Sequence, residues 1–87
     1  MKLYRFASGE TDFFAANDEA EARKLYQSEY GLRDRDMADV KVSVVDDPTT
    51  VSVYPDGWDY DSDDEPPTAA DTMAGMKHPG LVASTAV

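Results

Sequence analysis

The sequence predicts an α+β fold in which a four-stranded antiparallel sheet carries one main helix on one face. Three observations support this prediction. Two pairs of strand-like segments flank a single amphipathic helical segment, a turn separates the members of each pair, and 41% of the 87 residues are hydrophobic. The expected chain order is ββαββ, in a single small domain.

The first pair of strands is expected at residues 2–7 (KLYRFA) and 11–16 (TDFFAA). Both segments are rich in aromatic residues, which favour a pleated sheet. Ser8, Gly9 and Glu10 lie between them and have the composition of a turn, so we expect a hairpin.

A helix follows, with a start signal and a stop signal. Asp18 can cap its first turn, and Glu21 stands three residues later as in a capping box. Glu19 and Arg23 form an i,i+4 pair of favourable polarity, and Gly31 can adopt the left-handed conformation that ends many helices. The residues expected to face the sheet are Ala22, Leu25, Tyr26 and Tyr30.

The second hairpin is expected after a charged connection at residues 32–39, which forms a loop or a short helical turn. Residues 40–45 (VKVSVV) give the strongest strand signal, with Val40, Val42 and Val44 on one face. Residues 46–49 have turn chemistry, and residues 50–54 (TVSVY) are predicted to return as the fourth strand.

The chain is expected to divide into a ββαββ core at residues 1–57 and an acidic, proline-containing segment at residues 58–87. Thr68 and Asp71 match a capping box, which predicts a short second helix ending near residue 76. Residues 81–87 fit either a terminal strand or a frayed end. We expect the second segment to dock on the core, because it carries large apolar groups: Trp58, Tyr60, Met73, Met76 and Leu81.

Composition limits the possible functions. The chain has no cysteine, so disulfides, zinc–thiolate sites and thiol catalysis are excluded. No apolar run has the length of a signal peptide or a membrane span. The net charge of −10 argues against direct binding to nucleic acid or anionic membrane. These features predict a soluble cytoplasmic protein.

Charge is distributed unevenly along the sequence. Residues 1–41 contain seven Lys/Arg and nine Asp/Glu, whereas residues 42–87 contain one Lys/Arg and nine Asp/Glu. No cation occurs in residues 42–76, which carry all nine of the latter carboxylates: Asp46, Asp47, Asp56, Asp59, Asp61, Asp63, Asp64, Glu65 and Asp71. A field of one sign over a short segment attracts basic partners.

No motif in the sequence supports catalysis or a cofactor. Asp59, Asp61 and Asp63 have the spacing that begins a calcium loop, but Asp64 and Ala70 replace the required Gly and Glu. The only histidine, His78, lies in a His-Pro-Gly break, and its interpretation as a loop residue outweighs a catalytic role with Ser84 or Thr85. We therefore predict a binding protein that is not an enzyme and needs no cofactor or metal.

Aromatic residues among the aspartates suggest a docking surface for a basic protein. Rings flanked by charge match the composition of interaction hot spots for Arg- and Lys-rich surfaces. The alternatives are that the rings complete the core under a polar loop and that the charge serves solubility. The predicted partner-binding residues are Asp56, Trp58, Asp59, Tyr60, Asp61, Asp63, Asp64 and Glu65.

The segment 11–25 (TDFFAANDEAEARKL), a strand running into a capped helix, resembles parts of many small bacteriophage proteins. The hairpin–helix–hairpin layout of residues 2–54 and the acidic surplus are also similar to those of anti-CRISPR and other host-takeover inhibitors. The resemblance is one of layout and carries over no functional residue. It implies a stoichiometric inhibitor, located in the host cytoplasm, that occupies a nucleic-acid-binding surface of a host complex by mimicking charge.

Two other functions remain open from the sequence. A small structural or assembly protein would form homo-oligomers by pairing its sheet edges or residues 81–87 with a neighbour. A metal-responsive module would use the carboxylates of residues 59–65.

Overall fold

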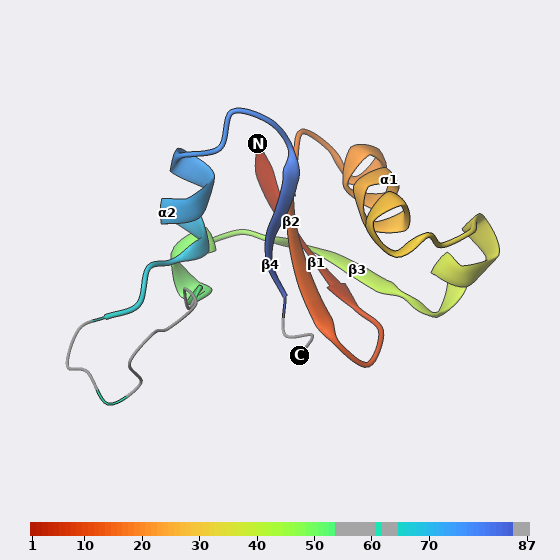
Figure 1. Ribbon diagram of the computed structural model, residues 1–87, viewed down its shortest axis with the longest axis horizontal. Coiled ribbons are helices and arrows are strands. Elements are labelled where there is room, and N and C mark those ends of the chain that lie inside the picture. The colour runs from red at the N-terminus through yellow and green to blue at the C-terminus, as the bar shows by residue number, and fades with distance from the viewer. Residues whose placement is uncertain (54–60, 62–64, 85–87) are drawn as a thin grey trace.

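The computed structural model describes residues 1–53, 61 and 65–84 of the 87-residue chain (Figure 1). The described residues confirm a four-stranded antiparallel sheet with one main helix. The strands are β1 (Lys2–Ala7), β2 (Thr11–Ala16), β3 (Lys41–Val45) and β4 (Gly80–Ser84). The helices are α1 (Glu19–Tyr30) and α2 (Ala69–Ala74), with short 3-10 helices η1 (Asp34–Asp39) and η2 (Pro48–Thr50).

The fourth strand was predicted at residues 50–54, and this prediction is wrong for residues 50–53, whereas Tyr54 lies outside the described residues. Pro48 begins η2, where the Asp47 side chain accepts a hydrogen bond from the Thr49 amide, and the backbone then contributes only an isolated bridge from Ser52 to Thr68. β4 supplies the fourth strand instead, at the other edge of the sheet beside β2, so the sheet order is β3-β1-β2-β4. The sheet therefore combines strands from both halves of the chain.

One face of the sheet, called here the α1 face, carries the main helix (Figure 1). Tyr26 of α1 stacks on Phe6 with ring centroids 4.5 Å apart, and Phe14 meets both rings edge-on. Leu25, Leu32 and Val42 complete the margin of this cluster. Aromatic pairs stabilise a fold by more than the burial of their apolar surface alone, so these contacts hold α1 against the sheet.

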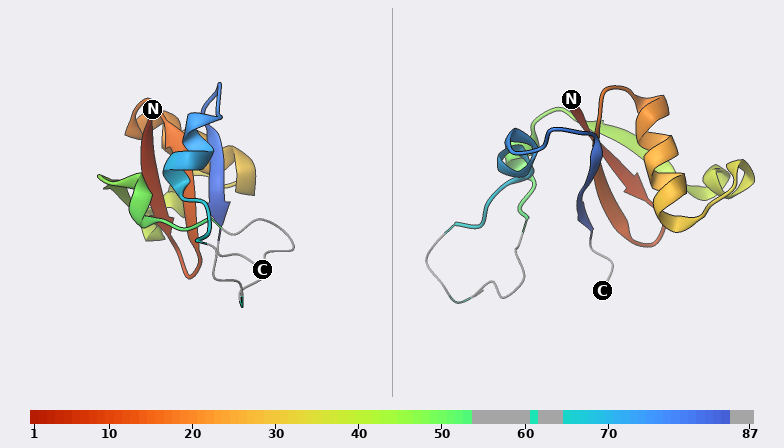
Figure 2. Two further views of the ribbon diagram at one scale, coloured as in Figure 1. Left: turned by 90° about the vertical axis from the view of Figure 1, so that its left-hand side faces the viewer. Right: turned by 45° about the horizontal axis from the view of Figure 1, so that its top comes forward.

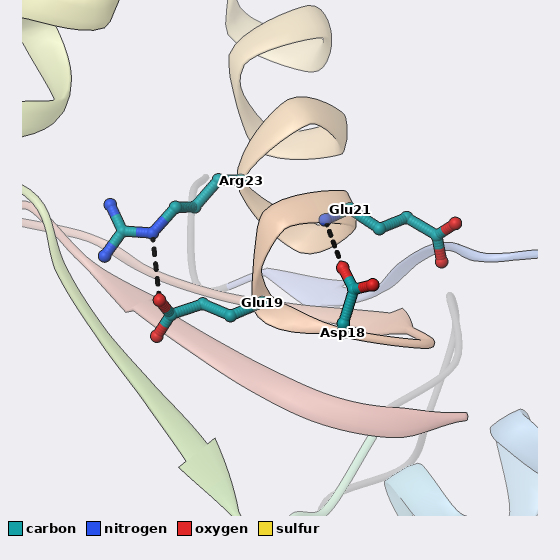
Figure 3. Close-up of polar contacts among 4 residues, drawn as sticks. All are labelled: Asp18, Glu19, Glu21 and Arg23. Carbon is teal, nitrogen blue, oxygen red and sulfur yellow. Dashed lines mark hydrogen bonds and ion pairs between the residues drawn. The ribbon is translucent and has the colours of Figure 1, made fainter.

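The ends of α1 follow the local signals in the sequence. The Glu21 amide donates to the Asp18 side chain at 2.8 Å, and Glu19 pairs with Arg23 at 3.4 Å (Figure 3). The Glu21 carboxylate accepts from the Asn17 amide and not from Asp18, so the capping box is shifted by one residue. Gly31 ends the helix at φ 63°, in the left-handed region that glycine tolerates.

The opposite face, called here the α2 face, is covered by α2, and η2 packs against α2 (Figures 1 and 2). Leu3, Ala15, Ala69 and Val82 are buried there, and the partly buried residues that pack against them are Phe13, Val45, Val51, Val53, Met73, Met76 and Ala83. The main helix was expected on one face, as observed, and the sequence did not indicate that a second helix would cover the other face. The strands of a sheet covered on both sides can bury adjacent residues, as Leu3 and Tyr4 do.

Candidate interaction site

The acidic segment, defined here as residues 54–66, begins and ends at the same place on the scaffold. The Val53 amide donates to the Pro67 carbonyl at 2.8 Å, and the Ala69 amide donates to the Val51 carbonyl at 2.8 Å. A bridge between Ser52 and Thr68 lies between these two bonds. The acidic segment is therefore a loop closed at its base.

The base of the loop is held by α2, which starts where the sequence predicts. Thr68 and Asp71 form the predicted capping box: the Thr68 side chain accepts from the Asp71 amide, and the Asp71 side chain accepts from the Thr68 amide. Ala69 is fully buried, and Met73 and Met76 pack against the same cluster. The cap therefore joins the end of the loop directly to the core.

Two of the eight predicted partner-binding residues fall within the described structure. Asp61 and Glu65 are both exposed. The other six lie outside the described residues: Asp56, Trp58, Asp59, Tyr60, Asp63 and Asp64. Of the groups expected to dock, Met73 and Met76 pack on the core, whereas Leu81 is 43% exposed.

Other exposed carboxylates lie on the elements that hold the loop. Asp46 and Asp47 precede η2, which packs against α2, and Asp71 lies in the first turn of α2. Hydrogen bonds from the Thr49 hydroxyl and amide lower the pKa of the Asp47 carboxyl, which favours its charged form. Lys77 is the one Lys/Arg that the sequence supplies after residue 41. The loop is thus attached to a part of the scaffold with the same sign of charge.

The structure contains a buried polar cluster that was not predicted from the sequence. Asp12 is 2% exposed and accepts hydrogen bonds from the Tyr30 hydroxyl at 2.6 Å and from the Ser84 hydroxyl. The bond to Asp12 raises the pKa of the Tyr30 phenol above its ordinary value, and desolvation adds to this effect. The signal was present in the period-two pattern, because Asp12 alternates with Phe14 and Ala16 on the buried α1 face. The cluster ties β2, α1 and β4 together.

The described residues offer no further constellation for chemistry. His78 is exposed in the bend before β4, and Ser84 donates to the buried Asp12. Across residues 1–53, 61 and 65–84, no group of three His, Cys, Asp or Glu side chains could hold a metal ion. The calcium-like spacing of Asp59, Asp61 and Asp63 falls largely outside the described part of the chain.

Comparison with protein-family models, with curated proteins and with solved structures gave no match. In the described part of the chain, none of the helices has the length and apolar character needed to cross a bilayer.

Proposed function

We propose that this chain is a small, non-enzymatic inhibitor that binds a basic, nucleic-acid-binding surface of a host protein complex. The observation that supports the proposal is the closed base of the acidic segment, with the Val53 amide 2.8 Å from the Pro67 carbonyl. Between these anchors the sequence carries six carboxylates, two of the rings predicted to bind a partner and no cation.

Closing the loop on a packed scaffold favours binding. A segment whose ends are already joined loses less conformational freedom when it docks than an unanchored tail of the same length. The two rings, Trp58 and Tyr60, have the composition of binding anchors, and the surrounding charge steers association with a basic surface.

The predicted action is competition with nucleic acid. Each strand of a duplex presents negative charges at regular intervals, and proteins bind them with arginine and lysine. A dense run of carboxylates can occupy the same cationic groups. The exposed Asp46, Asp47 and Asp71 extend this negative surface onto the elements that hold the loop.

The first experiment is capture of partners from a bacterial lysate with the tagged chain, washed at about 0.1 M and at about 1 M salt, where screening shortens from roughly 10 Å to 3 Å. The captured protein is then tested for binding to a DNA or RNA duplex in the presence of increasing amounts of the chain. We expect salt-labile capture of a nucleic-acid-binding protein and loss of its bound duplex as the chain is added.

Matched variants distinguish the effect of the acidic segment from the effect of the chain's total net charge. The test variant combines Asp59→Asn, Asp61→Asn and Asp63→Asn. The control combines Glu10→Gln, Glu29→Gln and Asp39→Asn, which removes the same charge from exposed positions in the first half. We expect the test variant alone to lose competition with the duplex. If both variants compete with the duplex equally well, or if capture resists high salt, the charge-based mechanism is contradicted.

A further inference from the structure

The two edge strands of the sheet differ in regularity. β3 pairs with β1 through five consecutive partners, from Leu3 opposite Val45 to Ala7 opposite Lys41, with no shift of register. The pairing of β4 with β2 shifts between Phe13 and Phe14, which leaves Val82 without a direct Cα partner. Bulges of this kind protect a sheet edge from pairing with another chain. The edge formed by β3 has no such protection.

The outer side of β3 is open to further pairing. Among residues 1–53 and 65–84, no backbone hydrogen bond from another segment reaches its outer edge. Val42 packs against the core on the α1 face, but Val44, two residues along on the same face, is 50% exposed. An open groove of about 330 Å³ lies beside it, lined in part by Met1 and Pro48. β3 therefore exposes apolar surface at an unprotected edge.

The charges at the two ends of β3 are opposite. Lys41 is its first residue, and Asp46 and Asp47 follow its last residue. Within the described part of the chain, neither Lys41 nor Asp46 forms an ion pair. In antiparallel pairing centred on Ser43, Lys41 of each copy lies opposite Val45 of the other, next to the two aspartates that follow Val45, whereas parallel pairing would place like charges together. β3 is therefore complementary to itself in one orientation.

We propose that β3 pairs antiparallel with β3 of a second copy of this chain, so that the two four-stranded sheets become continuous. Directly opposed residues of antiparallel strands lie on the same face of the sheet. With Ser43 on the two-fold axis, Val42 of each copy lies opposite Val44 of the other. The four valines then extend the core of the α1 face across the dimer and cover the exposed Val44.

Sedimentation equilibrium of the full chain at concentrations up to about 1 mM tests the dimer. We expect a dimer for the native sequence and a monomer for Val44→Lys, because that change places a charge in the valine strip of each copy. Leu81→Lys is the matched control, since Leu81 is 43% exposed but lies on the bulged edge strand β4. Thermal unfolding of both variants checks that each remains folded. A monomeric native chain, or an equal response of the two variants, would overturn the proposal.

Cross-linking tests the register. The chain has no cysteine, so Ser43→Cys introduces a single thiol. Opposed Cα atoms in antiparallel strands are about 4.5–5.5 Å apart, within the range for a disulfide. We expect a disulfide-linked dimer for Ser43→Cys and none for Ser28→Cys, a control at an exposed position on α1. Equal cross-linking of the two would refute the β3 contact, and a dimer that fails to cross-link at Ser43 would refute the register centred on that residue. The variant with Asp59→Asn, Asp61→Asn and Asp63→Asn should still dimerise. The dimer is therefore tested independently of the inhibitor function.

Discussion

Among the described residues, Asp12 is the charged side chain that is almost fully buried, so its desolvation opposes folding. Burying an ion costs several kcal/mol unless hydrogen bonds compensate. Here the hydroxyls of Tyr30 and Ser84 both donate to the same carboxylate oxygen. They also connect three elements that are distant in sequence.

Replacing Asp12 with Ala tests whether these hydrogen bonds outweigh the desolvation of the carboxylate. We expect the free energy of unfolding to fall by about 2–3 kcal/mol, as for other bonds to a charged group. Urea denaturation measures the change. Glu10→Ala removes an exposed carboxylate in the neighbouring turn and should change stability by less than about 0.5 kcal/mol. A neutral or stabilising Asp12→Ala would mean that the cost of desolvation equals or exceeds the gain from the hydrogen bonds.

Tyr30 should make stability depend on alkaline pH. Its pKa is raised in the folded chain, first by the hydrogen bond to Asp12, so the unfolded chain loses the phenol proton first as pH rises. The protonated Tyr30 phenol therefore makes its full contribution to the free energy of unfolding below the unfolded pKa of about 10. This contribution is lost as pH rises through the higher folded pKa. Unfolding by urea at several pH values between about 8 and 11 should show a steeper loss for the native chain than for Tyr30→Phe. Parallel curves would contradict this assignment.

At the scale of elements, α2 is short and depends on its cap. A helix of six residues has too few internal hydrogen bonds to be stable alone. Thr68 supplies the first-turn acceptor and also bridges to Ser52 at the base of the acidic segment. The stability of α2 and the closure of the loop should therefore be coupled.

Thr68→Ala should reduce the free energy of unfolding by about 1 kcal/mol, the usual cost of losing a capping side chain. The more specific readout is hydrogen exchange of the Val53 and Ala69 amides, whose acceptors are the Pro67 and Val51 carbonyls. Both amides should exchange faster in the variant, whereas amides in β1 should change little. Ser28→Ala, at an exposed position of α1, is the control. Unchanged exchange at both amides would show that the loop base does not depend on the cap.

Elements defined by local signals were predictable from the sequence. The caps of α1 and α2, the turn between β1 and β2, and the alternation of Val40, Val42 and Val44 depend on neighbouring residues, which the sequence displays directly. The fourth strand was not predictable in this way. Residues 80–84 pair with β2 at one edge of the sheet, whereas residues 51–53 follow η2 and pack with α2 on the second face. These contacts are distant in sequence and have no local pattern.

At the scale of the whole molecule, the two halves of the chain share the scaffold but differ in net charge. Seven of the eight Lys/Arg residues lie in residues 1–41, which supply β1, β2, α1 and η1. β3 spans the boundary, and the later half supplies η2, α2 and β4 together with half of the Asp/Glu residues. Because β4 pairs with β2, the acidic half cannot detach without opening the sheet. The acidic segment is an insertion between two parts of the same scaffold.

Excising that insertion provides the sharpest whole-molecule test. Replacing residues 54–65 with a short Gly/Asn turn should leave a folded chain, because Val53 and Pro67 are already within hydrogen-bond distance. Shortening the loop should raise the free energy of unfolding by up to about 1 kcal/mol through a lower cost of loop closure. Thermal unfolding, circular dichroism and the duplex-competition assay are measured on the same variant. We expect a native fold and complete loss of competition. An unfolded variant would indicate that Trp58 and Tyr60 belong to the core. A folded variant that still competes with the duplex would show that the acidic segment is not needed for competition.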